Sequence, residues 1–99
     1  MQNSKLYNAI GLCMKAGKAQ SGAFSVEKAI KGNKAKLVLV ENGASDLTKS
    51  TYTALCGHYK IPIHFVESVG DAIGKPGRVS MAVMDEPFQK MIEGLLAQE

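Results

Sequence analysis

The sequence predicts an α/β protein, a three-layer α/β/α sandwich built on a small mixed sheet of about four strands. Two patterns support this fold class. Several segments repeat apolar residues at three- and four-residue steps, as helices with one buried face do. Between them lie short apolar runs such as residues 37–40, which are typical of strands buried on both faces. Because the two patterns alternate along the chain, we expect the sheet to lie between two layers of helices.

The first third of the chain is predicted to form two helices. Asn3 or Ser4 can cap the first helix, and Gly17 is expected to end it. The second helix begins after Gly22 and ends before the first buried strand. Residues 18–21 lie between the helices and can add a short edge strand to the sheet.

The middle of the chain continues the alternation. A third helix can be capped by Ser45 or Asp46, because side-chain oxygens of these residue types accept the free amide hydrogens of a first turn. Pro62 then marks the entry to a second strand at residues 63–66.

The last third contributes one helical turn at residues 69–73, a third strand at 79–84 and a final helix capped by Asp85. We expect the buried stripe of this helix to comprise Phe88, Met91, Ile92 and Leu95. A chain of 99 residues is too short to divide its apolar residues between two cores, so residues 1–99 are predicted to form a single domain.

Several classes of function are disfavoured by what the sequence lacks. No apolar run approaches the roughly 20 residues of a membrane span, and no glycine motif of a phosphate-binding loop occurs. Cys56 and His58 have no second ligand pair at a metal-binding spacing. The spacing of Cys13 and Cys56 suits no disulfide framework, which favours the reducing cytoplasm. We therefore expect a cytoplasmic, non-catalytic protein without a cofactor or metal.

Positive charge is concentrated at the start of the chain. Residues 1–36 contain seven lysines and a single acidic residue, Glu27. Lys28 and Lys31 share one face of the second helix because they lie three positions apart. Such a cluster is typical of a surface that binds phosphates, although a merely solvated lysine surface would have the same composition.

Phe24 lies on the unexpected side of the second helix. At about 100° per residue, it falls opposite the apolar stripe and on the same side as Lys28 and Lys31. An aromatic side chain on a basic face suits the stacking of nucleobases. The alternative from periodicity alone is a phenylalanine packed beneath a neighbouring loop.

The glycine-rich loop at residues 74–79 is a second candidate for ligand binding. Gly74 permits close approach of a ligand to the backbone, and Arg78 is the only arginine in the chain. An ordinary loop before a strand is the alternative. Spacing does not determine whether this loop meets the second helix.

The sequence resembles the L-seven-Ae ribosomal protein family, and especially its small bacterial members. The likeness covers nearly the whole chain in order. It is carried by the segments GLCMKAGK at 11–18, SG at 21–22, EKAIK at 27–31, AKLVLV at 35–40, LC at 55–56, YKIPI at 59–63 and GDAIGK at 70–75.

This resemblance implies an α/β/α sandwich that binds kink-turn or related bent RNA. In archaeal and eukaryotic members the second helix begins Gly-x-Asn-Glu-x-x-Lys, and its Asn and Glu read guanine edges. Gly22 and Lys28 match this pattern here, whereas Phe24 and Ser25 replace the Asn-Glu pair. The resemblance also implies that the loop before the last strand lies beside this helix and covers an extruded nucleotide.

We therefore predict a non-catalytic, ribosome-associated protein that binds bent or kink-turn-like structured RNA as a monomer. The alternative is a protein-interaction module with Phe24 as its hydrophobic anchor. The predicted RNA-binding residues are Lys18, Gly22, Phe24, Ser25, Lys28, Lys31, Gly74, Lys75, Arg78 and Val79.

Overall fold

The computed structural model describes residues 4–98 and has the order of elements that the sequence predicts, including the short edge strand. The elements are α1 (Ser4–Lys15), β1 (Ala19–Ser21), α2 (Ala23–Lys31), β2 (Leu37–Glu41), α3 (Asp46–Tyr59), β3 (Ile63–Val66), α4 (Val69–Ala72), β4 (Ser80–Val83) and α5 (Glu86–Leu96). Asn3, one of the two caps expected for α1, lies outside the described residues.

The sheet has four strands in the order β1-β4-β2-β3. β2 and β3 are parallel, whereas β4 runs antiparallel to both β1 and β2. The predicted small mixed sheet is therefore confirmed. β2 and β4 occupy its centre and are buried along their length. β3 is an edge strand, and its Phe65 is exposed.

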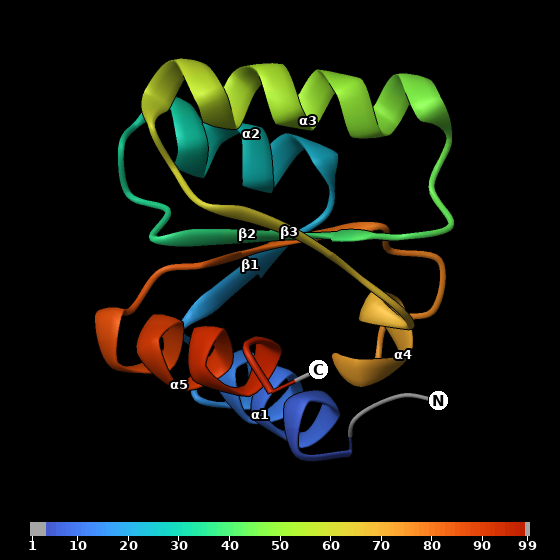
Figure 1. Cartoon of the computed structure of the whole chain (residues 1–99), viewed down its shortest axis with the longest axis vertical. Helices are drawn as coiled ribbons and strands as arrows, with labels where there is room; N and C mark the ends of the chain where they lie inside the picture. The colour runs from blue at the N-terminus through green and yellow to red at the C-terminus, as the bar shows by residue number, and fades with distance from the viewer. Residues whose placement is uncertain (1–3, 99) are drawn as a thin grey trace.

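Helices cover both faces of the sheet, as the buried strands require. Figure 1 shows α2 and α3 on one face and α1, α4 and α5 on the other. Successive residues of a strand point to opposite faces. Leu37 and Leu39 accordingly pack with α1, α4 and α5, whereas Val38 and Val40 pack with α2 and α3. The three-layer sandwich predicted from the sequence is thus confirmed.

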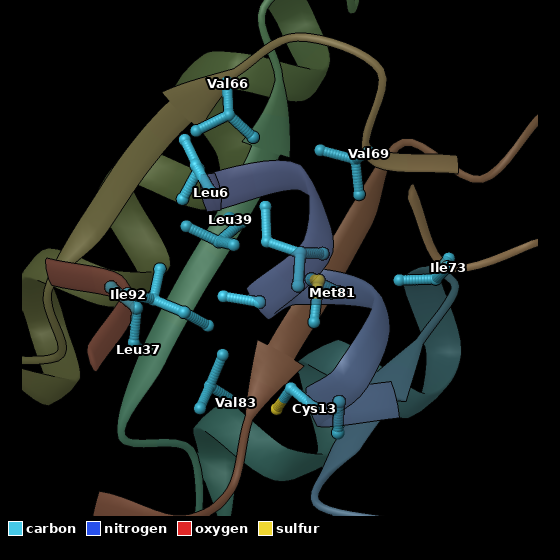
Figure 2. Packing of buried hydrophobic residues seen from close by; sticks show 13 residues of the cluster. Leu6, Cys13, Leu37, Leu39, Val66, Val69, Ile73, Met81, Val83 and Ile92 are labelled. Atoms are coloured by element: carbon cyan, nitrogen blue, oxygen red, sulfur yellow. The ribbon is translucent and has the colours of Figure 1, made fainter. Parts of the chain in front are cut away.

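The core beneath α1 also shows one error in the sequence prediction. Figure 2 shows Leu6 and Cys13 of α1 and Ile92 of α5 over side chains of β2 and β4. Ile92 is the one fully buried residue of the stripe predicted for α5, while Phe88 and Leu95 are half-buried. Met91 is exposed, contrary to expectation. The reason is that α5 packs mainly against α1. This single neighbour covers only part of the apolar face of α5, and Met91 lies on the uncovered part.

Two helix caps form as predicted. The Ser45 hydroxyl oxygen accepts a hydrogen bond from the Thr48 amide at 3.1 Å, and Asp85 accepts one from the Phe88 amide at 3.3 Å. Each satisfies an amide hydrogen that the helix leaves without a partner. Within residues 4–98, no helix has the length and apolar character needed to cross a bilayer.

Candidate nucleic-acid interface

The start of α2 is open because a glycine occupies its cap position. β1 ends at Ser21, and Gly22 turns the chain into the helix with a φ of 89°. Such a positive φ favours glycine. Gly22 supplies no capping side chain, and the first turn of α2 contains no acidic residue. The amide hydrogens and the positive end of the helix dipole therefore face outward without a negative partner from the first turn.

Arg78 brings the loop at residues 74–79 to this helix start. Its Nη1 donates to the Ser21 carbonyl oxygen at 2.9 Å and lies 3.4 Å from the Ser21 hydroxyl oxygen. A Cβ atom on Gly22 would overlap the Arg78 guanidinium, so the guanidinium lies directly against the Gly22 backbone and would have to move if a side chain were added there. The loop at residues 74–79 and the start of α2 are therefore neighbours, which the spacing in the sequence did not determine.

Glu41 fixes the element that precedes this loop. Its carboxylate oxygens accept the Ser68 amide at 3.0 Å and the Val69 amide at 2.9 Å. Glu41 thus joins the end of β2 to the start of α4. The sequence prediction missed this role, since a glutamate after an apolar strand gives no sign of a partner 27 residues away.

Gly70 lets the loop backbone lie directly on α4. A Cβ atom at this position would be 2.8 Å from the Lys75 carbonyl oxygen and 2.9 Å from the Arg78 carbonyl oxygen. The Lys75 amide also donates to the Gly70 carbonyl at 2.8 Å. Glu41 and Gly70 together determine where the Arg78 backbone lies.

Phe24 projects from α2 into solvent beside this arrangement. Its side chain is 81% exposed, which confirms the orientation inferred from periodicity and excludes packing beneath a loop. Phe24, Ser25 and Arg78 line a hollow at the start of α2. Phe24 also shares an open surface with Glu27, Lys28 and Lys31. The exposed aromatic ring therefore lies beside three basic groups, Arg78, Lys28 and Lys31, and one acidic group, Glu27.

The remaining predicted residues lie further from the start of α2. Val79 lines a neighbouring hollow together with Glu41, Gly70 and Arg78. Gly74 and Lys75 are exposed in the same loop. Lys18 lies at the opposite end of β1, about 13 Å from Gly22 at the rise of a strand. The structure therefore does not assemble Lys18 with the others.

The two cysteines are buried, and burial sets the protonation of their thiols. Burial raises the pKa of Cys56 to about 11, and burial together with the nearby Asp85 charge raises that of Cys13 to about 11. Both thiols therefore stay protonated at neutral pH, unlike a nucleophilic cysteine. No cluster of three metal-ligating side chains occurs in the part of the chain that the structure describes.

Comparison with known proteins assigns a family to this arrangement. The model of the family described as "Ribosomal protein L7Ae/L30e/S12e/Gadd45 family" matches residues 4–93. The chain is 38% identical over 99 residues to "RNA-binding protein YlxQ" of Bacillus subtilis, covering 97% of this chain and 99% of that protein. It is 38% identical over 85 residues to "Large ribosomal subunit protein eL30" of Tetrahymena thermophila, covering 81% of this chain and 82% of that one. A solved structure from Bacillus halodurans, titled as a protein with unknown function, superposes with a TM-score of 0.89 at 31% identity, covering 96% of this chain and 99% of that one.

Proposed function

The chain belongs to the Ribosomal protein L7Ae/L30e/S12e/Gadd45 family, and we propose that it is a non-catalytic, ribosome-associated RNA-binding protein. We further propose that it acts as a cytoplasmic monomer on bent or bulged RNA. The observation that carries the proposal is the Arg78–Ser21 contact, which sets a guanidinium beside the open start of α2 and the exposed Phe24. The names of its bacterial and ribosomal relatives support the same class of ligand.

Phosphate contacts supply most of the affinity in this proposal. The amide hydrogens of the first turn of α2 and the Arg78 guanidinium can bind one phosphate together. Lys28 and Lys31 are exposed on the same helix and can neutralise the phosphates that follow along the strand. Lys18, Lys75 and the exposed backbone at Gly74 extend the positive surface for longer RNAs. Such binding releases counterions and therefore weakens steeply with salt.

Base recognition rests on Phe24 and its neighbours. Phe24 can stack on an unpaired base, Ser25 can form one hydrogen bond, and Val79 offers an apolar contact on the loop side. Phe24 cannot hydrogen-bond a guanine edge, unlike the Asn at this position of kink-turn-binding relatives. We therefore propose shape recognition of a bulge, with little preference for a standard kink-turn over a control whose G·A pairs are disrupted.

The test is an anisotropy titration of a fluorescent kink-turn hairpin and its G·A-disrupted control at several salt concentrations. Lys28→Glu should weaken binding of both RNAs, and the Lys28→Glu/Lys31→Glu double variant should abolish it. Lys90→Glu is the matched control, since it makes the same change of charge at an exposed position of α5, across the sheet. Equal binding by the double variant and the wild type would refute the proposed face.

The exposure of Phe24 also favours a second candidate, a hydrophobic anchor for a protein partner. Salt dependence separates the two. Each phosphate-contacting lysine should contribute about one to the slope of log affinity against log salt. A contact anchored by phenylalanine should show little slope.

A further inference from the structure

A hollow beside α2, on the side away from Arg78, adjoins the surface described so far. It is lined by residues of β1, α2 and the segments that follow α2 and β4, among them Gln20, Phe24, Lys28, Gly32, Lys34 and Met84. We call it the Met84 hollow. Its volume of about 440 Å³ falls within the roughly 300–1,000 Å³ of small-molecule sites. Arg78 does not line it, so it is distinct from the hollow at the start of α2.

The lining combines an apolar floor with a polar rim. Met84 is half-buried and packs against the core between the sheet and α2. Gln20 pairs with Ala82 across β1 and β4, and Ala82 belongs to the same core, so the Gln20 side chain lies on the α2 face of the sheet. Gly32 adds no side chain and leaves the end of the hollow open.

The charge of the rim indicates the chemistry of the occupant. Lys28 and Lys34 are both exposed there, and no acidic residue lines the hollow. Phe24 and Ser25 line both this hollow and the one that Arg78 lines. A flat apolar group that carries negative charge at its edge fits these walls. An unpaired nucleotide has this combination, whereas an apolar peptide side chain leaves both lysines without a partner.

We propose that the Met84 hollow holds one unpaired nucleobase of the bound RNA. The base stacks on Phe24 over Met84, the Gln20 amide bonds its edge, and its phosphate lies between Lys28 and Lys34. This inference rests on the proposed function and adds a second base site to it. Gln20, Lys34 and Met84 thereby become part of the RNA-binding surface.

The experiment follows methionine methyl signals by NMR in full-length protein labelled at the methionine methyl groups. The probe is an RNA hairpin with a bulge of three adenosines. Its control is the same hairpin with abasic bulge positions, which keep the phosphates and remove the bases. The bulged hairpin should move the Met84 methyl signal upfield through the ring current of the base. The Met91 signal should stay in place, because Met91 is exposed on α5 across the sheet.

Two variants and the abasic probe make the inference falsifiable. Lys34→Glu should weaken binding of the bulged hairpin about tenfold, whereas Lys90→Glu should not. The abasic hairpin should bind about tenfold more weakly than the bulged one and leave Met84 unmoved. Gly32→Leu should also suppress the Met84 shift by filling the hollow. The φ of −86° at Gly32 is one that leucine can adopt, and its Cβ, 3.3 Å from the Lys28 carbonyl oxygen, requires a shift of a few tenths of an ångström.

The outcomes separate this inference from the proposed function. RNA binding that Lys28→Glu weakens while the Met84 signal never moves would overturn the inference and leave the proposed function in place. The inference would also be overturned, and the proposed function kept, if the abasic hairpin shifted the Met84 methyl signal as much as the adenosine bulge does. Failure of every RNA to bind would overturn both, as would a Met84 shift caused only by an apolar peptide.

Discussion

Replacing Gly70 by alanine should displace the loop at residues 74–79, which we propose binds RNA, without changing any charged side chain. Three backbone atoms surround the position where the new Cβ would lie. They are the Lys75 carbonyl oxygen at 2.8 Å, the Arg78 carbonyl oxygen at 2.9 Å and the Arg78 amide nitrogen at 3.2 Å. Real Cβ contacts essentially never fall below 3.0 Å, and none of these atoms ends a flexible side chain. The loop backbone must therefore shift as a unit.

The size of the effect follows from this crowding. Inserting a methyl group into a well-packed site costs about 1–3 kcal/mol. In a domain of this size, each kcal/mol lowers the melting temperature by about 4–8 °C. Gly70→Ala should therefore lower it by about 5 °C or more, measured by circular dichroism. The shift should also move Arg78 away from Ser21 and weaken RNA binding at temperatures where the variant is fully folded.

Gly57→Ala is the matched control. Gly57 lies in α3, and nothing outside its own helix would come within 4 Å of a new Cβ there. Removing a glycine from a helix stabilises it by up to about 1 kcal/mol. The two substitutions should therefore change the melting temperature in opposite directions, and RNA binding should change only for Gly70→Ala. Equal melting temperatures for Gly70→Ala and the wild type would refute the argument that the loop is fixed by backbone contact.

Three further predictions follow from burial and exposure. Phe24→Ala should change the free energy of unfolding by no more than about 0.5 kcal/mol, but it should weaken RNA binding by about 1–3 kcal/mol. A loss of more than about 3 kcal/mol in the free energy of unfolding would instead identify Phe24 as a core residue. Tyr52→Phe removes the 2.8 Å hydrogen bond to the buried Ser80 hydroxyl, which should cost about 1–3 kcal/mol in urea unfolding. Because burial raises the pKa of Cys13 and Cys56 from 9.0 to about 11, the folded chain keeps thiol protons that the unfolded chain loses over this range. The stabilisation from these two thiols should be fully present below about pH 9 and should be lost between about pH 9 and 11. If a Cys13→Ala/Cys56→Ala variant lost as much stability over this interval as the wild type, the thiols would not be its source.

The sequence predicts the elements of this fold well because the relevant signals are local. The apolar run at residues 37–40 and the caps at Ser45 and Asp85 each depend on a few consecutive residues. The order of strands is different, since β4 lies between β1 and β2 although it comes last in the chain. No local pattern reports that arrangement. Met91 shows a related limit, because periodicity identifies an apolar face but not how much of it a neighbour covers.

The candidate site likewise combines features that local sequence predicts with contacts between residues far apart in the chain. The exposure of Phe24 follows from helical geometry, and the structure confirms it. The bond from Arg78 to Ser21 spans 57 positions, and the bonds that Glu41 accepts span 27 and 28. Sequence alone shows these residues as one arginine in a loop and one acid after a strand. Only the folded chain shows that Glu41 binds the start of α4 and that Arg78 binds Ser21, just before α2.

The starts of helices α2 to α5 are satisfied in two ways, and the difference supports the ligand position that we propose. Side-chain oxygens of Ser45, Glu41 and Asp85 accept amide hydrogens at the starts of α3, α4 and α5. At α2 the cap position is glycine, and the Arg78 guanidinium bonded to the preceding Ser21 carbonyl oxygen is itself a donor. A glycine at the cap position costs only a few tenths of a kcal/mol relative to a capping side chain, so this helix start is slightly less stable when no ligand is bound. A phosphate oxygen would satisfy the α2 amides and the guanidinium together, which is the physical reason why we propose that the RNA backbone binds at this end of α2.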